Sequence, residues 1–158
     1  MNSITQINGD IVFDAKPDAV PYNYRISYKV SQLCLLMHVC GWGGSCSLIK
    51  IHMIAFSLLS HTNALKLLDF VQGKGVSPIV RFDPAINRAL TFAVAYGFIN
   101  QIKTGNFKLT ESGKKLAEQI LLAGDIMICE LETLNSLGKT LSETKIDELE
   151  KQWRGWIC

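Results

Sequence analysis

The segment YGFINQIKTGNFKLTESGKKLAEQI, residues 96–120, holds the strongest fold signal in the chain. Gly97 ends an apolar helical stretch, and apolar and polar side chains alternate from residue 98 to residue 103, as in a strand. Thr104-Gly105-Asn106 suits a tight turn, because glycine readily adopts the positive φ that such loops need. Phe107 and Leu109 then return on one face. The pattern predicts a β-hairpin over residues 98–109.

Helix boundaries on both sides of this hairpin are marked by capping residues. Thr110 can cap a helix after the hairpin, and Glu111 suits the positive end of that helix's dipole. Before the hairpin, Asp83 can cap a helix whose first residue is Pro84, where the missing N–H costs nothing. A helix, a short hairpin and a new helix form the sequence signature of a winged helix-turn-helix domain. We therefore expect a mainly α fold with a small β-hairpin over residues 23–122.

The remaining sequence predicts helices around this centre. A helix over 24–40 is apolar nearly all round, which places it centrally or at an interface. The glycine-rich residues 41–44 separate it from an amphipathic helix over 45–60, in which Lys50 lies off the apolar stripe. The other expected elements are an N-terminal arm (1–22), a helix (63–72), and a C-terminal helical extension (123–158) with helices near 125–137 and 142–153.

Composition restricts the class of protein only weakly. The net charge of +2 implies no nucleic-acid or membrane partner by itself. Residues 1–120 carry 12 basic and 7 acidic side chains, whereas residues 121–158 carry 4 and 7, so a mildly basic body precedes a mildly acidic tail. No basic segment of a signal peptide opens the chain. The charge-free run over residues 30–49 is interpreted as two buried helices meeting at a glycine turn, so we expect a cytoplasmic protein without a membrane span.

Five cysteines, an odd and irregularly spaced set, favour reduced thiols over a disulfide framework. Zinc usually needs a closely spaced ligand pair on a tight turn, and this chain has no CxxC motif. The cysteines sit instead in apolar helices, where cysteine acts as a small core residue. We predict neither a metal site nor a cofactor from the cluster that comprises Cys34, His38, Cys40, Cys46 and His52.

A thiol nucleophile is the remaining catalytic hypothesis. Cys46 can lie near the start of a helix, which would lower the pKa of its thiol, and His52 could serve as its base. The sequence offers no obvious third group to orient the histidine. It also lacks a Walker loop, a GxGxxG motif and paired carboxylates. We therefore expect no catalytic residues and no enzymatic activity.

DNA binding depends on the helix before the hairpin, PAINRALTFAVAYG, in which Gly97 ends the helix. A helix that enters a DNA groove needs polar side chains for the bases and cations for the phosphates. This helix supplies Arg88 and Thr91 but is otherwise largely apolar, while the hairpin supplies Lys103 and Lys108. These four residues are the candidate DNA contacts of a winged-helix transcriptional regulator, which is the alternative function.

The apolar excess favours a protein partner. The helix over residues 84–96 can bury only part of its girth in a small domain, and the rest would suit an interface. Exposed tryptophan is a common anchor of such interfaces. The candidate interface residues are Leu90 and Val94 on this helix, with Trp153 and Trp156 at the C-terminus. The tryptophans could equally dock back onto the protein's own first helix.

Three segments together resemble a known family: YRISYKVSQLCLLMHVCG (24–41), LIKIHMIAFSLLS (48–60) and PIVRFDPAINRALTFAVAYGFINQIKTGNFKLTESGKKLAEQI (78–120). They are similar to the middle component of bacterial ABC-three-component systems, which include Lamassu-type anti-phage defence. The most particular match is the apolar helix pair ahead of the helix opened by Asp83-Pro84. The resemblance implies a non-catalytic adaptor that bridges an SMC-like coiled-coil ATPase and an effector, often a nuclease. It carries over no catalytic residues.

Overall fold

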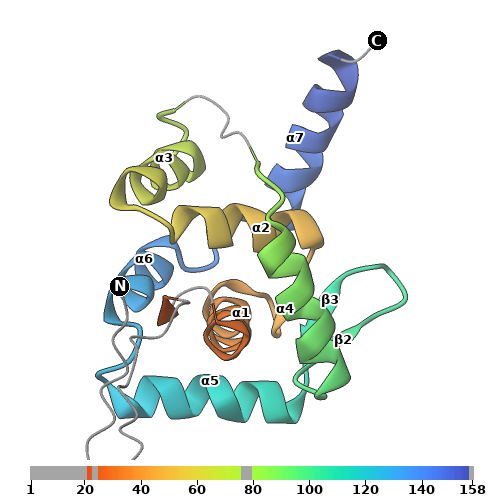
Figure 1. The fold of residues 1–158 in the computed structure, drawn as a ribbon. Helices are drawn as coiled ribbons and strands as arrows, with labels where there is room; N and C mark the ends of the chain where they lie inside the picture. Colours follow the sequence, from red (N-terminus) through yellow and green to blue (C-terminus); the bar gives the residue numbers. More distant parts are fainter. Residues whose placement is uncertain (1–20, 23–24, 76–79, 157–158) are drawn as a thin grey trace, which may run out of the picture.

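The computed structural model describes residues 21–22, 25–75 and 80–156, with only the backbone of Trp156. This part of the chain is mainly helical, with a small three-stranded antiparallel sheet (Figure 1). The arm predicted for residues 1–22 lies outside the described residues, except for Pro21 and Tyr22. The elements in chain order are α1 (Ile26–Cys40), β1 (Ser45–Cys46), α2 (Leu48–Ser57), α3 (His61–Val71), α4 (Pro84–Ala95), β2 (Ile99–Gln101), β3 (Phe107–Leu109), α5 (Glu111–Ala123), α6 (Ile128–Leu137) and α7 (Glu143–Trp156).

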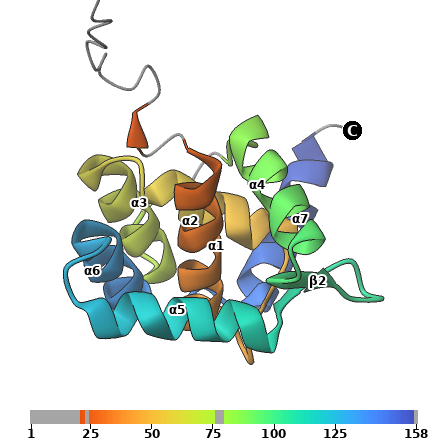
Figure 2. The same ribbon diagram turned by 60° about the horizontal axis from the view of Figure 1, so that its bottom comes forward.

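Helix α1 occupies the centre of the protein. Figure 1 shows it end-on, and it contacts α2, α4, α5 and α6. In Figure 2, α5 crosses the lower end of α1, with α6 and α4 on opposite sides. Every side chain from Gln32 to Met37 is buried, which uses all sides of the helix. The prediction from its all-round apolar pattern, a central position, is therefore confirmed.

The sheet has the strand order β1-β3-β2, with both pairs antiparallel. The predicted hairpin is confirmed as β2 and β3, and Gly105 in its turn has a φ of 88°. The expected helix over residues 45–60 was wrong at its start, because Ser45 and Cys46 form β1 and pair with β3. Helix α2 begins only after Ser47, whose Oγ accepts a hydrogen bond from the Lys50 backbone N–H.

Both predicted caps beside the hairpin are confirmed. Asp83 Oδ1 accepts from the Ala85 N–H at 2.9 Å, and Thr110 Oγ1 accepts from the Gly113 N–H at 3.2 Å. The first turn of α5 also lies directly against the start of β2. A Cβ at Gly113 would stand 2.2 Å from the Phe98 carbonyl oxygen, so only glycine permits this approach.

The two C-terminal helices pack on the body and share its core, to which Leu134, Leu141 and Ile146 belong. The first turn of α7 connects two earlier helices. Glu143 Oε1 accepts from the Ser47 N–H at 3.0 Å, and Lys145 Nζ donates to the Val71 carbonyl at 2.8 Å. An acid thus lies at the start of α2 and a base at the end of α3, as the two helix dipoles favour.

Candidate functional site

Helix α4 turns one side to the core and leaves the other exposed. Leu90, predicted as an interface residue, is only 4% exposed and belongs to the core, because its side of α4 packs on the body. The prediction was wrong in treating Leu90 as free surface. Val94, on the next turn, is 40% exposed and remains a candidate. Arg88 and Thr91 are exposed as well.

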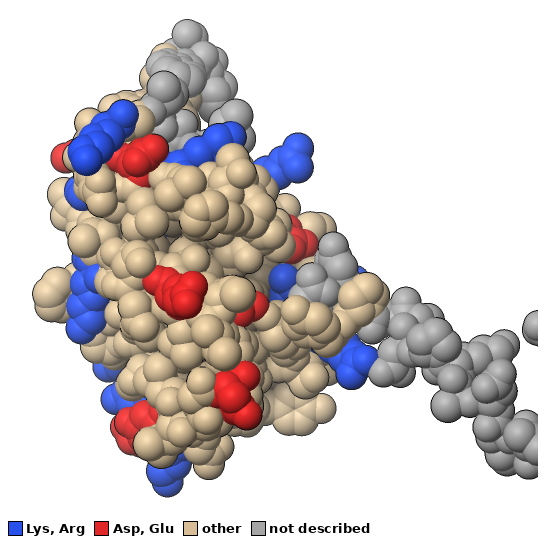
Figure 3. Space-filling view, turned by 90° about the vertical axis from the view of Figure 1, so that its left-hand side faces the viewer, with Lys and Arg blue, Asp and Glu red and all other residues tan. Residues whose placement is uncertain are grey.

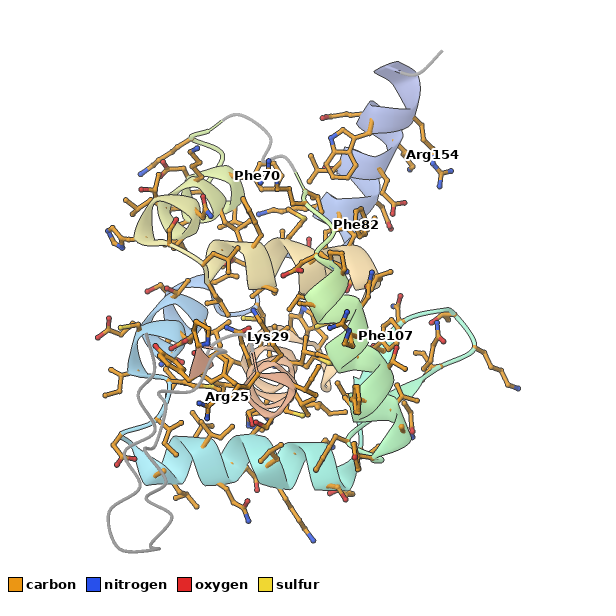
Figure 4. The ribbon with its side chains drawn as sticks, viewed as in Figure 1. Arg25, Lys29, Phe70, Phe82, Phe107 and Arg154 are labelled. Carbon is orange, nitrogen blue, oxygen red and sulfur yellow. The ribbon has the colours of Figure 1, made fainter. Side chains whose placement is uncertain are left out.

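A groove lies where α4 meets the hairpin and the start of α2. It has a volume of about 360 Å³, and Leu90 and Val94 contribute to it together with Phe107 from β3. Figure 4 shows Phe107 at the junction of α4 and the hairpin. All of its lining side chains are uncharged: Leu48, Asn87, Leu90, Thr91, Val94, Gln101 and Phe107. We call it the α4–hairpin groove.

An exposed aromatic pair on α4 was missed from the sequence. Phe92 and Tyr96 are 39% and 70% exposed, and their rings stack with centroids 6.1 Å apart and planes 14° apart. Residues four apart lie on the same face of a helix, so the spacing alone could have revealed the pair. Large exposed aromatic side chains are typical anchors of protein interfaces.

The C-terminal tryptophan candidates differ in what the structure describes. Trp153 is partly buried and packs against the core. The docking alternative named the first helix, whereas the contact that α7 makes is with α2. The side chain of Trp156 lies outside the described residues. Trp153 therefore attaches α7 to the body, and its role in a partner interface stays a prediction.

The four candidate DNA contacts are exposed and come from two parts of the fold, α4 and the hairpin. Side chains alternate across a strand, so Lys108 points away from the sheet face on which Phe107 lines the groove. Lys103 lies in the hairpin turn, beyond the end of β2. Thr91 Oγ1 donates to the Asn87 carbonyl at 3.0 Å, which occupies its only proton. Lys108 thus points away from the α4–hairpin groove, which Thr91 lines.

The buried cysteines lack the properties of reactive thiols. Burial raises the pKa of Cys34, Cys40 and Cys46 to about 12 each. The Lys50 charge lowers the pKa of Cys40 and Cys46 only in part, because burial has the larger effect. The thiolate is the form that attacks electrophiles and binds metals. Within the described ranges, no group of three or more His, Cys, Asp and Glu side chains could hold a metal ion.

His52 links α2 to the start of α4. Its Nδ1 accepts from the Asp83 backbone N–H at 3.2 Å, and its Nε2 lies 2.9 Å from Asn87 Oδ1. Because the amide oxygen can only accept, Nε2 carries the proton. The centroids of the Phe82 ring and the imidazole are 4.8 Å apart. Figure 4 labels Phe82 on the connection that leads into α4. Both ring nitrogens are occupied, so His52 does not act as a base for Cys46.

A second apolar surface lies at the corner between α5 and α6. Leu122, Ile126 and Ile128 are 86%, 46% and 52% exposed there. Between them, Met127 adopts a φ of 54°, a left-handed conformation that is costly for a residue with a side chain. On the face shown in Figure 3, acidic side chains are scattered among uncharged residues and basic ones lie mainly along the edges. The sequence pattern did not reveal this corner, because it predicted a helix that includes residues 125–127.

No helix in the described ranges has both the length and the apolar character needed to cross a membrane. The charge-free run over residues 30–49 is divided, because α1 ends at Cys40 and β1 stands between it and the start of α2 at Leu48. In comparisons with protein-family models, curated proteins and solved structures, no match to this chain was found.

Proposed function

We propose that this protein is a non-catalytic adaptor of a bacterial anti-phage defence complex. In that role it bridges an SMC-like coiled-coil ATPase and an effector subunit, a nuclease, in the cytoplasm. The family resemblance of residues 24–122 motivates the proposal. The uncharged α4–hairpin groove carries it, because a groove with polar and apolar walls but no cation suits a protein segment better than a phosphate backbone.

The body of the adaptor is a winged helix in this proposal. The order α4, hairpin and α5 supports this assignment, and the pairing of β1 with β3 extends the hairpin into a three-stranded sheet. One feature departs from a DNA-reading helix-turn-helix, whose two helices are joined by a turn of three or four residues. Residues 72–83 separate α3 from α4, a much longer connection. This departure favours protein binding over DNA reading by α4.

The proposal is tested by co-purification of the tagged chain with its operon neighbours. Val94→Glu places a charge in the groove and is expected to weaken capture of one partner about tenfold or more, as at an interface anchor. Leu65→Glu is the matched control, because Leu65 is 47% exposed on α3, away from the groove. Circular dichroism should show that both variants fold.

Two outcomes would contradict the adaptor proposal at different levels. If the unmodified chain captures neither an ATPase nor an effector, the adaptor role is wrong. If Val94→Glu retains both partners at the level of Leu65→Glu, the α4–hairpin groove is not an interface, and the role must rest on another surface.

DNA-binding regulation is a second candidate, supported by the exposure of Arg88, Lys103 and Lys108. If Lys103 and Lys108 contact phosphates, replacing each with glutamine should reduce the slope of log affinity against log salt by about one. The affinity is measured by fluorescence anisotropy with duplex DNA over a salt series. No binding at low salt eliminates this candidate.

A further inference from the structure

Trp42 is held beside the sheet by a tight turn. It forms a β-bridge with Ser45, whose N–H donates to the Trp42 carbonyl at 3.0 Å. Between them, Gly43 and Gly44 have φ values of 58° and 75°, and a type I′ turn requires a positive φ at both central residues. The Gly44 carbonyl accepts from the Leu109 N–H of β3 at 2.9 Å. The turn is therefore fixed to the central strand, although the Trp42 side chain is 64% exposed.

Trp42 begins a row of side chains on the outer face of the sheet. Its partner Ser45 pairs with Lys108 of β3, and Lys108 pairs with Asn100 of β2. Residues directly opposite one another in an antiparallel sheet point to the same face, so all four share a face. The next residue of β1, Cys46, points to the other face and is fully buried. We call the four residues the Trp42 row.

The Trp42 row is positively charged. Lys139, from the turn between α6 and α7, places its Nζ over the Trp42 ring, 4.9 Å from the centroid. Lys108 lies two strand positions from Trp42, about 10 Å at the usual strand spacing. Both lysines are exposed. Glu111, two residues after β3, is already ion-paired with Lys114 at 3.4 Å.

An exposed tryptophan between two lysines has the chemistry that binds a single strand of nucleic acid. Unpaired bases stack on aromatic rings, and the phosphates between them bind ammonium groups. In a duplex, neighbouring base pairs cover the faces of each base, so Trp42 could not stack without opening the duplex. A protein partner suits this face less well, because lysine is depleted at protein interfaces. The hairpin that carries Lys108 projects from the body, which leaves room for a strand to pass (Figures 1 and 2).

We propose that the Trp42 row is a binding site for single-stranded DNA. Trp42 stacks on one unpaired base, while Lys108 and Lys139 bind the phosphates on either side of it. Selection of RNA would need groups that read the 2′-hydroxyl, whereas the exposed charged groups here are lysines, which suit phosphate, and the Ser45 hydroxyl is half-buried. The site does not rest on the adaptor role, and it differs from duplex reading by α4.

Binding of a fluorescent oligothymidylate to the purified full chain tests the stacking contact. With an oligomer of about twelve nucleotides at low salt, Trp42→Ala should weaken the affinity about fivefold or more, as loss of one stacked base does. Trp42→Phe should retain most of the affinity, because phenylalanine still stacks. Tyr22→Ala, at an aromatic residue that is 66% exposed and precedes α1, is the matched control and should bind like the unmodified chain.

The salt dependence of the same binding tests the two lysines. Lys108→Gln and Lys139→Gln should each reduce the slope of log affinity against log salt by about 0.7, the value for one phosphate contact on a single strand. Lys66→Gln, at an exposed position of α3, is the control and should leave the slope unchanged. Circular dichroism should show that all variants fold.

Four outcomes would overturn the proposal. The Trp42 row is not a nucleic-acid site if oligothymidylate fails to bind at low salt, or if Trp42→Ala binds it as tightly as Tyr22→Ala. Tighter binding of a duplex of equal length would assign the lysines to double-stranded DNA, and tighter binding of oligouridylate would replace DNA by RNA. If Trp42→Ala instead releases a protein captured from the operon, the row is a protein interface. Because the DNA assays use this chain alone, their failure is distinct from failure of the adaptor role.

Discussion

Replacing Gly113 with alanine tests how α5 meets the hairpin. The new Cβ would lie 2.2 Å from the Phe98 carbonyl oxygen and 2.8 Å from Leu109 Cδ2, whereas ordinary contacts begin near 3.4 Å. Helix α5 must then retreat by about 1 Å, an overpacking that costs about 1–3 kcal/mol. The retreat also weakens the hydrogen bond from the Thr110 N–H to the Phe98 carbonyl, worth about 1 kcal/mol. The higher helix propensity of alanine relative to glycine offsets about 1 kcal/mol of this loss in stability.

The net expectation is a loss of about 1–3 kcal/mol in the free energy of unfolding. Urea denaturation followed by circular dichroism measures it. Gly155→Ala is the matched control, because Gly155 is also helical but a Cβ added there would have no atom within 4 Å. That variant should gain up to about 1 kcal/mol. If Gly113→Ala is as stable as Gly155→Ala, α5 does not approach Phe98 as described.

Three further predictions concern the tail, the thiols and the link from α1 to α6. Glu143→Ala should lower the free energy of unfolding by about 1–2 kcal/mol in urea denaturation, because the Ser47 N–H loses a charged acceptor. The control Glu148→Ala, at an exposed position of the same helix, should change this free energy little. At pH 8, a thiol reagent should label exposed Cys129 but not Cys34, Cys40 or Cys46, as read by peptide mass spectrometry. A pKa of about 12 leaves roughly one thiol in ten thousand ionised at each buried position. Rapid labelling of these three cysteines would contradict their burial. Tyr28→Phe removes the hydroxyl that donates to the Glu130 carboxylate and should cost about 1–2 kcal/mol in thermal or urea unfolding, while Tyr22→Phe, at a residue 66% exposed, should be neutral.

Local signals made the centre of the fold predictable. Asp83 and Pro84 mark the start of α4, Gly105 marks the hairpin turn, and Thr110 marks the start of α5, each through chemistry within a few residues. The strand β1 was missed because its two residues acquire strand geometry only by pairing with β3, far along the chain. No propensity within residues 45–60 contains that information.

The candidate site was less predictable than the fold. Val94 was identified from the apolar character of α4, but Leu90 was assigned to the surface because helical periodicity does not show how much of a helix its neighbours cover. The burial of Lys50 was not predicted either, because a charged residue off an apolar stripe is normally solvated. The α4–hairpin groove depends on Phe107 and Leu48 meeting α4, a contact that only the tertiary structure reveals.

The strand order of the sheet also has a consequence for folding kinetics. The β2–β3 hairpin closes a short loop and can form within microseconds, whereas β1 must find β3 across a loop of about sixty residues. We therefore expect β1 to pair last, once α2, α3 and α4 have brought Cys46 to Phe107. Until then the outer edge of β3 is an open strand edge, and a newly made chain is most exposed to aggregation during that interval.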